Sequence, residues 1–375
     1  MSDQNPAGSQ QYHITVQDSR YFAIGDGARV EHPPAGEPPP PPAVSFSLLS
    51  PTFPTAYSHH LDARAFPFVT FTLDNRHAHQ AATVQVSAVI TGLSDTASAT
   101  AVIEAGQRVQ VSLLPLLPRP AAASLNEIRP ATLRLTAQQT APRPGRLLDQ
   151  TERIHLLARD SALLAVQPAG HLTDLTPYLA AWVTPRIPPV EQLLRQAVAY
   201  HPRGEFAGYQ GAADPAASPL LVRQQVQAIF RTLKEQAHLA YINAPLSLGA
   251  AAGQIMQRVR LPSQSLSTPG SANCLDGSVL LASLLELAAL EPLILLVPGH
   301  ALVGWRTRPG QEPLEFLETT LIGRRDFDLA WQRGQATYAR ARQAGYFERD
   351  LFDPAGFARL IDVAACRRQG IYPLE

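Results

Sequence analysis

The first half of the chain is patterned as short strands. Between residues 66 and 158, runs in which apolar and polar side chains alternate are separated by turn-forming residues. Alternation with a period of two places the apolar side chains of a strand on one face of a sheet. The expected strands are 66–73, 82–90, 100–104, 108–114, 131–137 and 153–158. This series of strands predicts an all-β, antiparallel sandwich over residues 44–165.

From about residue 170 the hydrophobic period changes to that of helices. In the segment 221–237, Val222, Val226 and Leu233 fall on one helical face, together with Ile229 and Phe230. Helices are expected at 189–200, 221–237, 273–290 and 326–344, and strands at 293–297, 301–306 and 314–320. Helices followed by antiparallel strands predict an α+β domain over residues 170–375.

Residues 1–43 precede these two domains as an N-terminal tail. Short strands are expected at 12–16 and 21–24. The segment 33–42 contains five consecutive prolines, which favour a semi-rigid polyproline spacer. The sequence therefore predicts a linker here, and a ligand for a proline-reading module is the alternative.

Composition excludes several classes of protein. Lys+Arg and Asp+Glu are both 31 among 375 residues, so the basic excess of a nucleic-acid binder or a polybasic membrane-surface protein is absent. The apolar stretch near 279–297 is interrupted by Glu286, Glu291 and Pro292, and the N-terminus lacks the features of a signal peptide. Two cysteines rule out a disulfide framework and a cysteine-based zinc cluster. We expect a cytoplasmic protein without a metal or another cofactor.

Cys274 is the first candidate for chemistry. It falls at the first turn of the helix expected at 273–290, which Ser271 or Asn273 can cap. Unpaired backbone N–H groups and the positive end of the helix dipole stabilise a thiolate there, and the thiolate is the nucleophilic form. The alternative is that Cys274 is a small buried hydrophobic residue.

His300 and Glu318 are expected to face each other. His300 begins a strand, and Pro309-Gly310 turns the chain back into a second strand that ends near Glu318. A hairpin centred near residue 309 places His300 opposite Glu318, with Cβ atoms about 5 Å apart. Glu318 can then orient the imidazole, which can act as the base for a thiol. A slip of one residue would bring Thr319 opposite instead.

The order Cys, His, acid on a helix and two successive strands resembles that of transglutaminase-like cysteine peptidases, which have a papain-type fold. The motif Cys274-Leu275-Asp276, the Leu-rich helix 280–287, Gly299-His300-Ala301 and Glu318 carry the resemblance. It is strong over 257–320 and is closest to bacterial domains of this type. Glu318 stands where Asp is more common, and the interval between Cys274 and His300 is short for the family.

This resemblance implies a catalytic triad and a domain order. Cys274 would be the nucleophile, His300 the base and later the acid, and Glu318 the orienting residue. An immunoglobulin-like sandwich ahead of such a domain is consistent with the domain organisation of the family. The expected chain is thus multidomain: an all-β immunoglobulin-like sandwich followed by an α+β transglutaminase-like hydrolase domain.

Four further side chains are candidates for the site. Gln264 and Gln257 can donate to an oxyanion beside the Cys274 N–H, although an ordinary surface or packing role is the alternative for each. Asp276 can hold the backbone of the site, accept a hydrogen bond from a substrate amide, or simply favour the helix dipole. Trp305 can wall a cleft or belong to the core, and Cys366 is expected to be structural.

The expected activity is hydrolysis of amide bonds in a protein or peptide substrate. Protein-glutamine amine transfer or deamidation is the second hypothesis, and a catalytically inert binding or scaffold module is the third. Some of the bacterial domains that this segment resembles occur in conflict and defence proteins. The resemblance therefore implies an effector role in such a system for this chain. A protein partner is then expected to bind through the tail or the sandwich, and neither a nucleic acid nor a membrane is expected as a partner.

Overall fold

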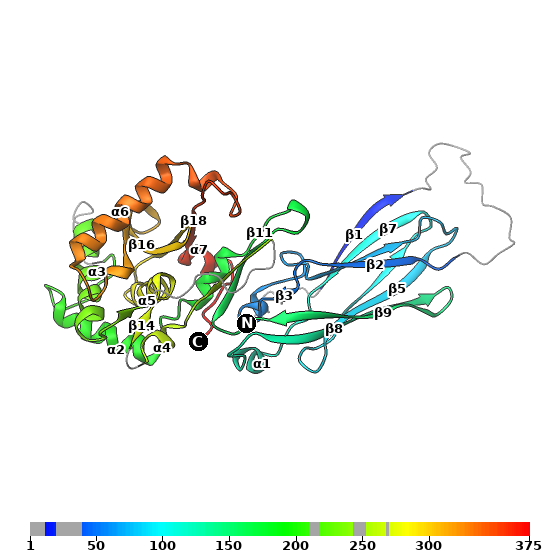
Figure 1. Cartoon of the computed structure of the whole chain (residues 1–375), viewed down its shortest axis with the longest axis horizontal. Coiled ribbons are helices and arrows are strands. Elements are labelled where there is room, and N and C mark those ends of the chain that lie inside the picture. The colour runs from blue at the N-terminus through cyan, green and yellow to red at the C-terminus, as the bar shows by residue number, and fades with distance from the viewer. Residues whose placement is uncertain (1–11, 20–39, 211–217, 243–252, 268–269) are drawn as a thin grey trace, which may run out of the picture. The chain divides into compact units, whose positions relative to one another are not determined.

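The computed structural model describes residues 12–19, 40–210, 218–242, 253–267 and 270–375. It divides into two compact units, Met1–Arg159 and Asp160–Glu375. The first unit is built almost entirely of strands, and the second mixes helices with strands. Figure 1 traces both units in sequence order.

The first unit contains two sheets. Its strands are β1 (Tyr12–Ser19), β2 (Ala43–Leu48), β3 (Thr52–Phe53), β4 (Val69–Asp74), β5 (Ala82–Ile90), β6 (Ala97–Ile103), β7 (Gln107–Leu113), β8 (Arg129–Ala141) and β9 (Gly145–Leu156), with short helices η1 (Ser58–His60) and α1 (Arg119–Ala123). One sheet has the order β1-β7-β4-β2 and the other β3-β9-β8-β5-β6. All neighbours are antiparallel except β3 and β9.

Alternate residues of these strands form the core of the first unit. Along β5 and β6 every second side chain is buried, as the period of two predicts. Phe53 of β3 and Phe68, just ahead of β4, meet edge to face with ring centroids 5.0 Å apart. This contact joins the two sheets through their buried faces, an arrangement that aromatic pairs favour.

The segment expected to be a tail contributes a strand to this unit. β1 pairs with β7 in an antiparallel ladder that runs from Tyr12 opposite Leu113 to Ser19 opposite Gln107. The strand expected at 12–16 is therefore confirmed and continues to Ser19, but it belongs to a sheet of the first unit and not to a separate tail. The strand expected at 21–24 and most of the proline-rich segment lie outside the described residues.

The second unit begins earlier than the sequence predicts. Its first strand, β10 (Ser161–Val166), pairs with β11 (Thr173–Asp174) on one side and with β13 (Gln254–Arg258) on the other. The sequence-based boundary assigned 161–165 to the sandwich. A short apolar run does not reveal its partner, and here the partner comes almost a hundred residues later.

The second unit contains a four-stranded antiparallel sheet and several helices. Its other strands are β12 (Ala240–Tyr241), β14 (Ser271–Ala272), β15 (Pro292–Val297), β16 (His300–Arg308), β17 (Gln311–Leu317) and β18 (Arg359–Asp362). The helices are α2 (Pro188–Ala197), α3 (Ser218–Glu235), α4 (Pro262–Ser265), α5 (Cys274–Leu287), α6 (Phe327–Gln343) and α7 (Val363–Arg368), with shorter turns η2 (Pro168–Gly170), η3 (Thr176–Trp182), η4 (Val198–Tyr200), η6 (Thr319–Leu321) and η7 (Tyr346–Glu348). The large sheet has the order β17-β16-β15-β18.

Helix α6 packs against β17 at very short range. Phe316 of β17 stacks on Tyr338 of α6, with ring centroids 4.3 Å apart. A Cβ atom on Gly334 of α6 would lie only 2.4 Å from the Phe316 carbonyl oxygen. The backbone of the helix therefore rests directly on the strand that leads to Glu318.

Helix α5 is the central helix of this unit. It contacts β16 and β15, and every residue from Cys274 to Leu285 is buried. A helix that is apolar on all sides is typical of a protein interior. Its first two residues, Cys274 and Leu275, line the cavity described next.

Candidate active site

Local hydrogen bonds fix the start of helix α5. The Asn273 Oδ1 accepts from the Asp276 N–H at 2.8 Å, and the Asp276 Oδ2 accepts from the Asn273 N–H at 3.1 Å. This reciprocal pattern is a capping box, with Asn273 rather than Ser271 as the cap. Cys274 is the first residue of the helix and is 3% exposed. Its sulfur thus lies at the positive end of the helix dipole.

Asp276 holds the backbone that presents Cys274. It is fully buried, and besides the cap it accepts from the Arg260 N–H at 2.8 Å and from the Arg260 Nε at 3.0 Å. Arg260 also donates to the Ser271 Oγ at 2.9 Å. Burial raises the pKa of Asp276, although these hydrogen bonds act in the opposite direction. With both of its oxygens occupied, Asp276 anchors the chain and does not line the cavity.

His300 and Glu318 form a short hydrogen bond. The His300 Nε2 lies 2.6 Å from the Glu318 Oε2. The other carboxylate oxygen accepts from the Thr320 N–H at 3.1 Å and from the Thr320 Oγ1 at 2.6 Å. The Glu318 N–H donates to the Ala330 carbonyl of α6 at 3.0 Å. Glu318 is therefore fixed through both its side chain and its backbone.

The expected register between the two strands is wrong by two residues. In the ladder Val303 faces Leu317, so β17 ends before Glu318, which instead caps η6. The register also shifts between Arg306 and Arg308, next to the Pro309-Gly310 turn on which the predicted hairpin is centred. An error of two residues keeps every side chain on its face of the sheet. For this reason Glu318 still reaches His300.

Electrostatic interactions favour the charged form of His300. Burial disfavours the imidazolium, but interactions with Cys274 and Glu318 outweigh it and raise the pKa of His300 to about 10. Burial would raise the pKa of Glu318, but the hydrogen bond and charge of His300, with hydrogen bonds from Thr320, lower it. At neutral pH the imidazolium lies between a carboxylate and the sulfur of Cys274.

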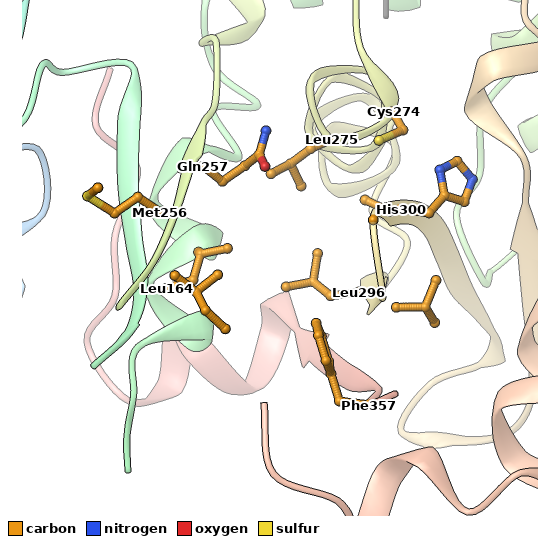
Figure 2. Close-up of a pocket in the computed structure, with 12 residues that line it drawn as sticks. Leu164, Met256, Gln257, Cys274, Leu275, Leu296, His300 and Phe357 are labelled. Atoms are coloured by element: carbon orange, nitrogen blue, oxygen red, sulfur yellow. The ribbon is translucent and has the colours of Figure 1, made fainter. Parts of the chain in front are cut away.

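A largely apolar cavity of about 200 Å³ opens beside Cys274 and His300. Figure 2 shows both side chains at one end of it, Cys274 from a helix and His300 from a strand. The rest of the lining comes from five chain segments: Leu164, Ile255, Met256, Gln257, Leu275, Leu296, Val297, Gly299, Ala301 and Phe357. An apolar cavity with a few polar groups at one end is typical of a binding site for a small group or side chain.

Of the two candidate glutamines, Gln257 lies in the cavity wall. It is on β13, and its Nε2 donates to the Arg258 carbonyl at 3.0 Å. An amide nitrogen carries two N–H groups, so one remains for a ligand. The Gln264 Oε1 instead accepts from the Leu261 N–H at 2.9 Å and caps α4. Gln264 does not line the cavity, so the structure does not place it at the candidate site as expected.

Two other expectations are resolved by burial. Trp305 is fully buried on β16 and is not among the residues that line the cavity, so it does not wall the cleft. Cys366 is buried on α7, and burial is the main reason that its pKa is raised to about 11. A thiol with a raised pKa is a weak nucleophile at neutral pH.

Tyr241 also lies near the candidate site, although the sequence does not predict it there. Residues of β12 pair in parallel with β14, with Tyr241 beside Ala272, only two residues before Cys274. Burial raises the pKa of Tyr241, and the charges of Cys274 and Glu318 raise it further, against the effect of Arg324. The Arg324 guanidinium lies 5.4 Å from the centre of its ring. No local sequence motif predicts this residue. It comes close to the site only through the two-residue pairing of β12 with β14, which joins segments about thirty residues apart.

Comparison with known proteins adds no assignment. Neither the protein-family models nor the curated proteins contain a match to this chain. Within the described residues, no group of three or more His, Cys, Asp and Glu side chains is placed to bind a metal. No helix in that part of the chain has the length and apolar character needed to cross a bilayer.

Proposed function

We propose that the second unit is a transglutaminase-like cysteine hydrolase, that the first is an immunoglobulin-like sandwich, and that the chain cleaves amide bonds in proteins or peptides. The observation that carries the proposal is the contact of the His300 Nε2 with the Glu318 Oε2, at 2.6 Å, at the mouth of the cavity that Cys274 lines. A nucleophile, a base and a group that orients the base are the parts of such a triad.

The first half of the reaction would use Cys274 and His300 as a pair. The Cys274 thiol gives its proton to His300, and the resulting thiolate attacks the amide carbonyl carbon, so that a C–S bond forms and the carbonyl π electrons move onto the oxygen as an oxyanion. When the C–N bond breaks, the His300 imidazolium gives its proton to the leaving nitrogen, and a thioester remains on Cys274. A raised pKa supports this role, because the proton is present before the amine needs it.

The oxyanion needs donors that already point at it. The Cys274 N–H at the start of α5 is unpaired within the helix, and the Gln257 amide lies in the wall of the same cavity. Removing a single donor of this kind typically lowers kcat by about 10²- to 10³-fold. We assign the second donor to Gln257 in place of Gln264.

The second half of the reaction depends on what attacks the thioester. Neutral His300 takes a proton from water, the hydroxyl adds to the carbonyl carbon, the C–S bond breaks and a carboxylic acid leaves. If a primary amine attacks instead, the product is a new amide, which is the amine-transfer alternative. An inert scaffold would make no thioester at all.

The test compares the two cysteines as nucleophiles. We expect iodoacetamide at pH 7 to alkylate Cys274 at least about tenfold faster than Cys366, as read by peptide mass spectrometry, because Cys366 is held as a buried neutral thiol. His300→Ala should remove the difference, and Cys366→Ser should not change the Cys274 rate. If Cys274 reacts no faster than Cys366 and ignores His300→Ala, the hydrolase proposal is wrong.

A second measurement identifies the acceptor. A peptide mixture from a digested proteome, incubated with the wild type and with Cys274→Ser, should show new termini only with the wild type. Adding a fluorescent primary amine distinguishes hydrolysis from amine transfer, since transfer leaves the amine covalently attached to peptides. Neither product, despite a reactive Cys274, would favour the scaffold alternative.

A further inference from the structure

A second groove is lined in part by Glu318. It has a volume of about 560 Å³ and runs between η6 and helix α6. Leu329, Arg333 and Arg340 line it from α6, at intervals that place them on one helical face. The remaining lining residues are Glu318, Thr320, Leu321, Arg325, Ala336 and Thr337.

Three arginines give this groove its character. Arg325, Arg333 and Arg340 are all exposed, and within the described part of the chain none of their guanidinium groups forms an ion pair. Other arginines of the second unit, such as Arg223 and Arg367, are paired with a carboxylate. Three unpaired like charges around one hollow repel each other, and an anionic ligand would relieve that repulsion.

The other residues that line the groove favour an acidic polypeptide over a nucleic acid as the anionic ligand. The described residues that line the groove include no aromatic side chain, so a nucleic acid would find no stacking platform. The chain as a whole has no basic excess. Leu321, Leu329 and Ala336 add apolar surface that suits aliphatic side-chain stems, and hydroxyls of Thr320 and Thr337 add hydrogen-bonding capacity. These features favour carboxylates on a polypeptide.

The position of the groove connects it to the candidate active site. Glu318 lines the groove and also holds His300, and its backbone N–H is bonded to α6 through Ala330. A polypeptide in the groove therefore lies next to Glu318, which lines the groove but not the apolar cavity. We propose that the groove binds an acidic segment of the protein substrate. The identification of this polypeptide as the substrate rests on the proposed function, whereas the binding of an acidic polypeptide does not.

The test measures binding in a chain that cannot react. Full-length protein carrying Cys274→Ser is titrated into a fluorescein-labelled octa-glutamate peptide at low salt, and anisotropy is recorded. We expect Arg333→Glu with Arg340→Glu to weaken binding at least about tenfold. Arg368→Glu, which changes an exposed arginine outside the groove, should leave the Kd within about twofold. Arg325→Gln, which only removes a charge, should weaken binding by a smaller factor.

Each outcome decides the proposal. If octa-glutamate does not bind, or if the groove and Arg368 variants behave alike, the groove does not recognise acidic polypeptides. If a single-stranded oligonucleotide of equal charge binds more tightly and is lost in the same variants, the ligand is a nucleic acid and the proposal is overturned. Because alkylation of Cys274 in the wild type is measured separately, failure of this proposal and failure of the hydrolase proposal can be told apart.

Discussion

The Thr319 hydroxyl donates a hydrogen bond of 3.1 Å to the backbone carbonyl of Cys274. Thr319 follows Glu318 directly, so the bond ties the acid of the candidate triad to the first turn of α5. The Thr319 side chain also fits against Gly277, where an added Cβ atom would lie 3.2 Å from it. The spacing between Cys274 and Glu318 is therefore set by one packed contact between η6 and the helix.

Replacing Thr319 should affect reactivity more than stability. Thr319→Val keeps the shape and removes the donor, but the Cys274 carbonyl still accepts from the Ser278 Oγ at 2.7 Å. We expect a loss of about 1 kcal/mol in the free energy of unfolding, and a clear fall in the alkylation rate of Cys274. Thr319→Ser keeps the hydroxyl and should restore the rate. A Thr319→Val chain that is less stable but alkylates normally would show that the contact is only structural.

Protonation of His300 should make stability depend on pH. Because the pKa of His300 rises to about 10 in the folded chain from its usual value of 6.5, the folded state binds more protons between these values. The stabilisation is complete below about pH 6.5 and is lost as pH rises towards 10. Urea unfolding of the wild type and His300→Ala at pH 6, 8 and 10 should show a difference that shrinks with pH. A constant difference would contradict the charged imidazolium.

Glu318 should contribute in the opposite pH range. Its pKa is lowered in the folded chain, so its stabilisation is present above its usual value of 4.5 and is lost as pH falls below it. The difference in unfolding free energy between the wild type and Glu318→Gln should therefore decline on acidification from pH 6 to 3. The variant Glu286→Gln, which breaks the Arg367 pair away from the site, controls for general acid effects. An equal decline on acidification for both variants would contradict a specific role of Glu318.

The two glutamines should separate an oxyanion donor from a helix cap. With a substrate peptide in hand, Gln257→Ala should lower kcat by about 10²- to 10³-fold with little change in KM, because the donor acts on the oxyanion. Gln264→Ala should leave kcat unchanged and cost about 0.5–1 kcal/mol of stability through the cap of α4. If both variants lose kcat equally, Gln257 is not a specific donor.

Replacing Gly334 tests how closely helix α6 packs against β17. In an exposed helix the change Gly→Ala normally stabilises by up to about 1 kcal/mol. At position 334 the new Cβ would lie 2.4 Å from the Phe316 carbonyl oxygen, so we expect destabilisation of about 1–3 kcal/mol instead. Ala339→Gly at an exposed position of the same helix gives the reference for helix propensity. The sign of the change, read by urea unfolding, tests the contact between α6 and β17.

The local pattern of apolar and polar residues predicts most helices and strands and the start of α5. Alternation predicts the strand at 82–90, which the structure has as β5 with the same bounds. The pair Asn273 and Asp276 caps α5 through contacts three residues apart, so the helix start could be predicted at Cys274. His300 and Glu318 meet despite a register error, because a shift of two residues preserves the face of a strand. These features depend on short-range periods, which the sequence carries directly.

Tertiary packing decided what surrounds those residues. The pairing of β10 with β13 moves residues 161–165 into the second unit and sets Gln257, not Gln264, in the cavity wall. Tyr241 reaches the site through a two-residue parallel bridge, and Arg333 gains its neighbours in the groove only because α6 rests on β17. Each of these depends on contacts between segments far apart in sequence. Their free energy comes from burial and pairing in the folded chain, and local propensity does not contain it.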